Sequence, residues 1–365
     1  MAPATWQELS VSSLSPRLQY CRVSRNQFYS SLAVRRSSDP TYTRVRCPQQ
    51  FLMPSQSPHH NPKVLAVMST SGRAAILNRA LHSLKDAGPN LAGVVVNDNG
   101  ETPETESLVM NAPVPSVYVK PTENLGCGGG VANALRTALL RNDIDYFWIL
   151  DDDCVVQSGS LEPLMHALDS GFHAAVPMVV AATGVIGWFP GLLEPEPWAM
   201  IKRFTTPEKY RAAFGVRPVR FSWAPWCSLL VSRTALLSAG LPRADYGFQG
   251  EDIEFTLRLT YHVPGVFVPE SVTFHLPPVP PIVKSRTRRV EINRAAWMLQ
   301  NNAYTATRLP HGRRALKFLP SNCYRLFRTF GLSGNTLTAA GNALLKGLII
   351  GVPAGRSNPP TVLST

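Results

Sequence analysis

An apolar run that ends in three consecutive carboxylates constrains this 365-residue chain more than any other feature. Residues 146–150 are all hydrophobic, Asp151, Asp152 and Asp153 follow them, and apolar residues resume at Cys154. Such a run predicts a buried strand that ends in the acids. Adjacent like charges repel one another, so a positive partner is expected, and carboxylate oxygens suit Mg²⁺ or Mn²⁺. An acidic turn on the surface is the alternative.

The residues before this run predict a largely parallel sheet. Two apolar runs, 64–68 and 91–96, flank a segment with helical spacing, and this order is typical of a βαβ unit. Ligands of such sheets bind beyond the carboxyl ends of the strands, which places Thr70, Arg73 and Asp98 at a candidate pocket. Asp98 equally suits a turn, because Asn-Asp-Asn-Gly is ordinary turn chemistry.

A glycine-rich segment precedes the acidic run. Asn124 and Gly126 lead into a stretch that ends in Gly129 and Gly130, and a helix is expected over 131–141. Glycines before a helix let backbone amides approach an anion, and the helix dipole favours the anion there. The spacing fits neither the dinucleotide fingerprint nor the P-loop. A flexible turn before a helix is the alternative.

Two further groups of residues are ambiguous when each is taken alone. Glu251 and Asp252 open a predicted helix, where acids are normal dipole chemistry. His275 ends a short predicted strand, and a lone histidine is usually a packed core residue. Trp223 and Trp226 surround a proline and form either core or a platform for a sugar ring or an apolar acceptor.

The net charge of +12 is concentrated at the two ends of the chain. Residues 1–62 hold seven Arg against two acids, and residues 284–365 hold thirteen Lys or Arg against one. This predicts a catalytic domain over 63–283, a poorly ordered or targeting extension before it, and a basic, mainly helical region after it. The basic region suits a membrane surface or an acidic acceptor, or is a solvated face. Nucleic acid is disfavoured, because no recognised binding motif accompanies the charge.

Cysteine spacing and hydropathy bear on the compartment. The six cysteines include no Cys-x-x-Cys pair, which supports neither a zinc site nor a disulfide framework. A cytoplasmic location is therefore expected, with peripheral attachment to the inner face of a membrane as an option. Residues 174–193 carry no charge and are long enough to span a bilayer, but their prolines and glycines favour a strand and a loop.

Taken in order, these motifs resemble those of glycosyltransferase family 2, the inverting enzymes that use sugar nucleotides. The resemblance covers about 63–310. The matching segments are Asn97-Asp98-Asn99-Gly100, Asn124-Leu125-Gly126 with Gly129-Gly130, Ile149-Leu150-Asp151-Asp152-Asp153, Gly250-Glu251-Asp252-Ile253-Glu254-Phe255 with Arg258, and His275. The glycine segment is most similar to the rhamnosyl- and galactofuranosyltransferase branch. The resemblance implies an α/β GT-A fold: a Rossmann-like, mostly parallel central sheet flanked by helices, with a basic helical C-terminal tail.

The chain departs from the family pattern at two places. Asn97 stands where relatives usually carry an apolar residue, and Gln300-Asn301 stands where the branch often shows an Arg-Asn pair.

The resemblance also implies roles for individual residues. Asp151 and Asp153 match the Asp-x-Asp motif, which holds Mn²⁺ or Mg²⁺ against the donor diphosphate, and His275 would complete the metal shell. Asp252 matches the general base, with Glu251 as the second choice. The implied donor-binding residues are Thr70, Arg73, Asp98, Asn124, Gly126, Gly129, Gly130, Asp151 and Asp152. Trp223 and Trp226 are the acceptor candidates.

The sequence therefore predicts a metal-dependent inverting glycosyltransferase. Its donor would be a UDP- or dTDP-sugar, and its acceptor a hydroxyl of a glycan, a lipid-linked glycan or a protein. A nucleotidyltransferase on a similar sheet is one alternative, although residues 69–72 lack the glycine and basic density that it would normally show. A non-enzymatic nucleic-acid-binding protein that uses the basic ends is the other. The role of Asp152 is left open.

Overall fold

The structure is a computed structural model of the chain. The residues it describes are 61–100, 102–193, 205–246, 249–276, 288–309 and 312–350. These described residues all belong to one compact unit. The predicted N-terminal extension lies almost wholly outside the described residues, and so does residue 284. The domain boundaries therefore remain predictions.

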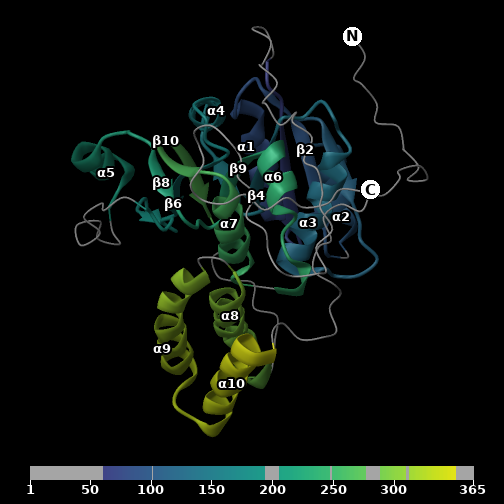
Figure 1. Cartoon of the computed structure of the whole chain (residues 1–365). Helices are drawn as coiled ribbons and strands as arrows, with labels where there is room; N and C mark the ends of the chain where they lie inside the picture. The colour runs from purple at the N-terminus through teal and green to yellow at the C-terminus, as the bar shows by residue number, and fades with distance from the viewer. Residues whose placement is uncertain are drawn as a thin grey trace, which may run out of the picture. The chain divides into compact units, whose positions relative to one another are not determined.

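Within the described residues, ten strands form one sheet with helices packed against it (Figure 1). The strands are β1 (Val64–Thr70), β2 (Leu91–Asp98), β3 (Ser116–Val119), β4 (Tyr146–Asp151), β5 (Cys154–Val156), β6 (Ala174–Ala181), β7 (Ile186–Gly187), β8 (Val219–Phe221), β9 (Ser228–Ser232) and β10 (Gly265–His275). Their order is β3-β2-β1-β4-β9-β6-β10-β5, with β7 paired to β6 and β8 paired to β10.

The sheet is parallel in one half and mixed in the other. Strands β3, β2, β1 and β4 pair in parallel, as β6 and β10 do. Strand β9 runs antiparallel between β4 and β6. The predicted α/β class is confirmed, and the predicted parallel pairing holds for the strands that carry the candidate pocket.

Helices cover both faces of the parallel half. The helices are α1 (Ala74–Ser83), α2 (Pro103–Met110), α3 (Gly126–Leu139), α4 (Leu161–Asp169), α5 (Pro207–Phe214), α6 (Arg233–Ala239), α7 (Glu251–His262), α8 (Arg288–Arg308), α9 (Phe318–Phe330) and α10 (Gly334–Leu345). Residues of α1 and α4 pack in one core with alternate residues of β1 and β4, while α3 also contacts β1. Burial on both faces explains why these strands are continuous apolar runs.

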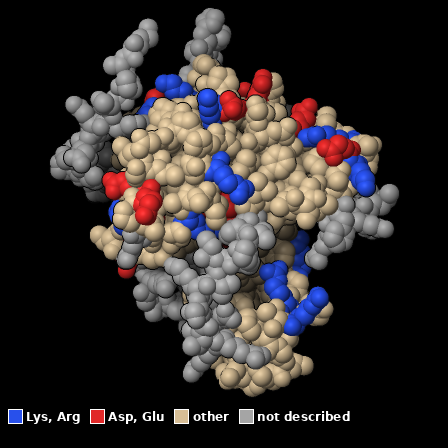
Figure 2. Space-filling model, turned by 180° about the vertical axis from the view of Figure 1, so that it is seen from behind, with Lys and Arg blue, Asp and Glu red and all other residues tan. Residues whose placement is uncertain are grey.

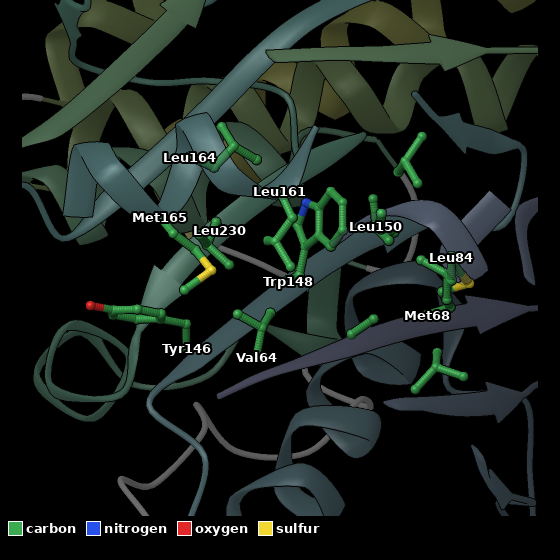
Figure 3. Close-up of a cluster of buried hydrophobic side chains, with 14 of the residues drawn as sticks. Val64, Met68, Leu84, Tyr146, Trp148, Leu150, Leu161, Leu164, Met165 and Leu230 are labelled. Carbon is green, nitrogen blue, oxygen red and sulfur yellow. The ribbon is translucent and has the colours of Figure 1, made fainter. Parts of the chain in front are cut away.

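Trp148 lies at the centre of this core (Figure 3). It is fully buried among Leu161 and Leu164 of α4 and Leu230 of β9. Its indole Nε1 donates a hydrogen bond to the Ser228 hydroxyl at 2.9 Å, so the one polar atom of the ring is satisfied. The packing therefore ties the strand before the acidic run to its antiparallel neighbour.

The uncharged stretch over 174–193 is a strand and a loop, as predicted. It contains β6, β7 and the residues after them. Among the described residues, no helix has both the length and the apolar character needed to cross a membrane.

The described residues after 287 are mainly helical. Helices α9 and α10 pack on α8 through a cluster rich in small side chains, which includes Ala296, Ala339, Ala340 and Ala343. Small residues let helix backbones approach closely. Gly347 follows α10, and a Cβ there would lie 2.3 Å from the Gln300 carbonyl oxygen.

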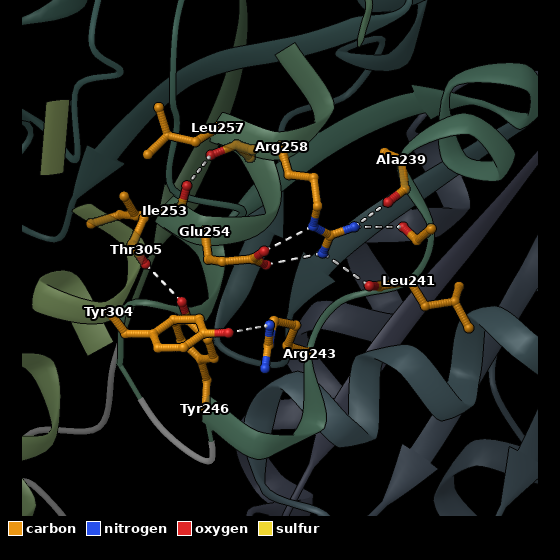
Figure 4. Close-up of polar contacts among 12 residues, drawn as sticks. Ala239, Leu241, Arg243, Tyr246, Ile253, Glu254, Leu257, Arg258, Tyr304 and Thr305 are labelled. Carbon is orange, nitrogen blue, oxygen red and sulfur yellow. Dashed lines mark hydrogen bonds and ion pairs between the residues drawn. The ribbon is translucent and has the colours of Figure 1, made fainter. Parts of the chain in front are cut away.

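Helix α7 is fixed to its surroundings by an arginine fork (Figure 4). Arg258 donates to both carboxylate oxygens of Glu254, with Nε–Oε1 at 2.8 Å and Nη2–Oε2 at 2.9 Å. The same guanidinium donates to the carbonyl oxygens of Ala239, Gly240 and Leu241, where α6 ends. The Glu254 side chain is 1% exposed, so this pair is buried. The contact fixes the helix that begins with the two candidate acids.

Replacement of Arg258 by alanine is expected to destabilise the fold strongly. It would leave the Glu254 carboxylate buried without its charge partner, a change that costs about 3–5 kcal/mol. The free energy of unfolding, measured by urea titration, checks this. Arg141→Ala is the control, because the Arg141–Asp143 pair is more exposed and is expected to contribute at most about 1 kcal/mol. Equal losses in the two variants would contradict the prediction.

Candidate active site

The carboxyl ends of three parallel strands bring the predicted pocket residues together. Thr70 of β1 is in register with Asp98 of β2, and Ser69 of β1 is in register with Asp151 of β4. Polar residues that are far apart in the chain therefore share one edge of the sheet, where ligands of parallel sheets bind.

Asp152, whose role the sequence left open, is a buried anchor. Its carboxylate accepts a 2.6 Å hydrogen bond from the Thr70 hydroxyl and is 1% exposed. Arg73 donates to Asp152 and also to Asp153, at 3.2 Å to the Oδ2 of Asp153. Burial raises the pKa of Asp152 to about 6, against the opposing effect of the Arg73 charge. Thr70 and Arg73 thus contact the acidic motif directly, and their role in donor binding remains a prediction.

Asp98 is fully buried at the end of β2. Its Oδ1 accepts from the Gly100 backbone N–H at 2.8 Å, which is the turn contact that the sequence offered as an alternative. Its Oδ2 accepts from the Tyr118 hydroxyl at 3.0 Å. Burial and the Asp98 contact raise the pKa of Tyr118 to about 12, so this phenol stays protonated and donates. A contact of Asp98 with a nucleotide base remains a prediction.

The glycine segment is helical and packs tightly against protein. Helix α3 begins at Gly126, five residues before the predicted start at 131. A Cβ on Gly128 would lie 2.5 Å from the Arg243 carbonyl oxygen, and a Cβ on Gly130 would lie 2.0 Å from the Ser69 hydroxyl. These glycines therefore allow close approach between α3, β1 and the segment before α7. The sequence predicts either anion binding or a flexible turn here, and anion binding by these glycines remains a prediction.

The turn before α3 is held by asparagines. Asn97 is fully buried, donates to Asn99 at 3.0 Å and accepts from Asn133 of α3 at 2.9 Å. Asn99 also donates to the Gly126 carbonyl oxygen at 2.8 Å. The Asn124 side chain accepts from the Gly126 N–H at 2.9 Å. Asn97, the departure from the family pattern, therefore serves as a hydrogen-bonding core residue.

The predicted metal ligands lie together. The Asp153 Oδ1 is 3.3 Å from the His275 Nε2, and Asp151 and His275 belong to one group of ligand atoms, all within 4.8 Å of one another. Burial and the neighbouring acids raise the pKa of Asp151 well above its ordinary value. A bound cation would relieve this cost, and the carboxylate and imidazole donors fit a divalent metal.

The same group includes Cys154 and Cys227, which the sequence did not single out. Cysteines 73 positions apart carry no local motif, so only the paired strands reveal their proximity.

The two candidate base residues open α7. Burial and the neighbouring Asp252 raise the pKa of Glu251 to about 7, and the Cys127 thiol hydrogen-bonds to the Glu251 carboxyl. Burial raises the pKa of Asp252 to about 6. The Asp252 Oδ1 accepts from the Ile253 N–H at 2.8 Å. Both carboxyl groups are therefore stronger bases than an ordinary surface acid.

A turn with left-handed backbone precedes these acids. Gln249 has φ 69° and Gly250 has φ 92°, and such a φ is costly for a residue with a side chain. Asn301 of α8 donates to the carbonyl oxygens of Tyr246, at 3.0 Å, and Gln249, at 2.7 Å. The asparagine that the sequence left unassigned thus supports the entry into α7.

Of the predicted acceptor tryptophans, Trp226 is buried and Trp223 is partly buried. Trp226 is 3% exposed and lies against Phe255, with ring centroids 6.0 Å apart. Trp223 makes an edge contact with Phe318, at 4.9 Å. A role for either in acceptor binding remains a prediction. Trp188, which the sequence analysis missed, is 42% exposed, has φ 45° and lies against His275, with ring centroids 4.2 Å apart and the rings tilted by 45°.

Comparison with known proteins identifies the domain. Residues 66–224 match the family model described as glycosyl transferase family 2. This match bears out the predicted resemblance to that family over residues 66–224.

A curated relative and two solved structures are similar to the chain. Galactofuranosyltransferase GlfT1 of Mycolicibacterium smegmatis is 34% identical over 94 residues, which are 26% of this chain and 31% of the relative. The match thus spans about a third of that relative's length. S. aureus TarS, residues 1–349, is 16% identical, with a TM-score of 0.51 and coverage of 80% of this chain and 81% of its own. It shares the fold, so the predicted GT-A architecture is confirmed. The mannosyltransferase PcManGT from Pyrobaculum calidifontis is 18% identical over 79% of this chain and 81% of its own, with a TM-score of 0.44.

Removal of the Thr70 hydroxyl is expected to destabilise the acidic motif. Thr70→Val takes one donor from the buried Asp152 carboxylate and should lower the free energy of unfolding by about 1–3 kcal/mol. Thr273→Val is the matched control, because the Thr273 hydroxyl is buried in β10 with no hydrogen-bond partner among the described residues. That change should be neutral or stabilising. Urea titration checks both variants. An unchanged free energy of unfolding in Thr70→Val would contradict a stabilising role for the Thr70–Asp152 hydrogen bond.

Proposed function

We propose that this protein is an inverting, metal-dependent glycosyltransferase that moves a sugar from a nucleoside diphosphate to an acceptor hydroxyl. One observation carries the proposal. In a glycosyltransferase family 2 domain, Asp151, Asp153 and His275 converge at the carboxyl edge of the sheet. Buried Glu251 and half-buried Asp252 open α7 and are the candidates for the base that such a transfer needs.

The chain's own residues suit the individual tasks. Asp151, Asp153 and His275 would hold a divalent cation, which when bound would offset the charge that develops on the departing diphosphate. Arg73 keeps Asp153 in place through its contact with the Oδ2. Asp252 would accept the proton of the acceptor hydroxyl. Attack from the face opposite the leaving group inverts the anomeric centre and needs no protein nucleophile.

The donor and the acceptor follow from the resemblance. Similarity to a galactofuranosyltransferase agrees with the predicted branch and supports a UDP- or dTDP-sugar donor. The proposed donor-binding residues are those implied by the family motifs, Thr70, Arg73, Asp98, Asn124, Gly126, Gly129, Gly130, Asp151 and Asp152. The acceptor would be a glycan, a lipid-linked glycan or a protein.

The surface of the C-terminal helices is the basis for proposing contact with an anionic membrane or a lipid-linked acceptor. Residues 292–350 contain no Asp or Glu, and Figure 2 shows Lys and Arg side chains on this region. Exposed apolar side chains accompany them, including Leu332, Leu337 and Ile349. Basic and apolar side chains together favour the interface of an anionic bilayer. Peripheral attachment to a membrane is therefore part of the proposal.

Substitution of a proposed metal ligand and substitution of the proposed base should have different effects on the reaction. A screen of UDP- and dTDP-sugars with and without Mn²⁺ should show release of nucleoside diphosphate with at least one donor. Asp153→Ala should abolish it. Asp252→Asn should keep donor binding and lose about 10²–10⁴-fold in kcat. Glu162→Gln, on the exposed side of α4, is the control and should match the wild type.

Two results would contradict this function. Release of pyrophosphate in place of nucleoside diphosphate would indicate a nucleotidyltransferase. Loss of donor binding in Asp252→Asn would contradict the proposal that Asp252 is the general base.

The pH profile should report the base. A group with its pKa raised to about 6 is protonated below that pH and then cannot accept the acceptor's proton. The kcat/KM value should therefore fall about tenfold per pH unit below pH 6 and level off above it. A break near pH 7 that disappears in Glu251→Gln would assign the base to Glu251 instead.

A further inference from the structure

Two cysteines meet at the candidate metal centre although their spacing in the sequence forms no metal motif. Cys154 opens β5 directly after the acidic run and pairs with His275 in the β5–β10 ladder. Cys227 immediately precedes β9, and its carbonyl oxygen accepts from the Asp151 N–H at 3.3 Å. Strands β4, β5, β9 and β10 therefore bring both thiols to one point, beside Asp151 and His275.

The four side chains form a compact set of ligands. Asp151, Cys154, Cys227 and His275 each offer one ligand atom, and these atoms all lie within 4.8 Å of one another. Cys154 is fully buried and Cys227 is 5% exposed. Two sulfurs, one imidazole nitrogen and one carboxylate oxygen make up a four-coordinate donor set of the kind that Zn²⁺ takes tetrahedrally.

His275 is oriented for such a role. Its Nε2 lies 3.3 Å from the Asp153 Oδ1, and the negative carboxylate favours the neutral tautomer with its proton on Nε2 and its lone pair on Nδ1. Within the described part of the chain, that Nδ1 is buried and has no hydrogen-bond partner. A buried nitrogen of this kind costs free energy unless it binds something. Asp153 would then serve as the carboxylate that orients the histidine, a common arrangement at zinc sites.

We propose that Asp151, Cys154, Cys227 and His275 bind Zn²⁺ or a similarly soft divalent cation. Binding forms two metal–sulfur bonds, and the two thiol protons pass to solvent. Mn²⁺ and Mg²⁺ prefer oxygen ligands and would use the carboxylates instead. Since Asp151 and His275 belong to both sets, the two kinds of ion exclude one another. Zn²⁺ is therefore an inhibitor that competes with the activating cation, a consequence that rests on the proposed function, whereas the binding itself does not.

Co²⁺ is the probe, because it takes tetrahedral zinc sites and reports sulfur ligands by its absorption. The full chain, kept reduced with a phosphine, is titrated with Co²⁺. The wild type should show a sulfur-to-cobalt charge-transfer band and intense visible bands that saturate at one equivalent, and one equivalent of Zn²⁺ should remove them. Cys154→Ala and Cys227→Ala should each weaken Co²⁺ binding by at least about 10-fold and reduce the charge-transfer band.

Two other cysteines supply matched controls. Cys323→Ala, on α9, and Cys127→Ala, beside Glu251, should keep the full band. Thermal unfolding checks that each variant is folded. The wild-type titration decides the question even where a variant fails to fold, because absence of the sulfur-to-cobalt band in the wild type overturns the proposal. A band that survives in both Cys154→Ala and Cys227→Ala overturns it equally.

Activity measurements separate this proposal from the proposed function. With Mn²⁺ present, Zn²⁺ should inhibit the wild type and inhibit Cys227→Ala at least about 10-fold more weakly. A protein that binds Co²⁺ through sulfur yet transfers no sugar would retain the metal site and refute the transferase. An active transferase without the sulfur-to-cobalt band would support the proposed function and refute the metal site.

Discussion

Repulsion among the carboxylates that follow β4 sets the conditions for the rest of the site. Asp151, Asp152 and Asp153 lie together at one edge of the sheet, where desolvation disfavours the charges of Asp151 and Asp152. Thr70 and Arg73 compensate Asp152 by direct contacts, and Arg73 also reaches Asp153. Asp151 has a side-chain contact with Cys227 and the charge of Arg73 nearby, but no contact with Arg73 like those of Asp152 and Asp153 is recorded among the described residues. Because these contacts favour Asp152 and Asp153, a bound cation would stabilise the charged form of Asp151 most.

A second set of contacts fixes helix α7, which carries the two candidate base residues. These contacts come from α6, before α7 in the chain, and from α8, after it. The Arg258–Glu254 fork fastens the body of this helix to the end of α6. Asn301 of α8 fastens the turn before the helix. Arg243 adds a contact with the Tyr304 hydroxyl at 3.0 Å, also on α8. The C-terminal helices are thus part of what positions the candidate base, in addition to any role at a membrane.

The sequence predicted those features of the structure that a local pattern of residues determines. Apolar runs predicted β1, β2 and β4, and the order of motifs predicted the family and the GT-A fold. The start of α3 was placed too late, because helix propensity disfavours glycine, whereas close packing against Ser69 and Arg243 requires it. The cysteines were dismissed because their spacing is not local. Trp188 belongs to no local motif, and its place beside His275 emerges only from the folded chain. Contacts between segments far apart in the chain decide both cases, and one sequence does not reveal such contacts.

The position of β9 has a consequence for how the polypeptide acquires its structure. This strand comes late in the chain, yet it hydrogen-bonds to both β4 and β6 in the middle of the sheet. The segment that matches the family model ends at residue 224, four residues before β9 begins. A fragment cut there would leave two interior strands with bare edges, and such edges favour aggregation. During synthesis, the halves of the sheet can join only after β9 has left the ribosome, so the site is completed late and through long-range contacts, which form slowly.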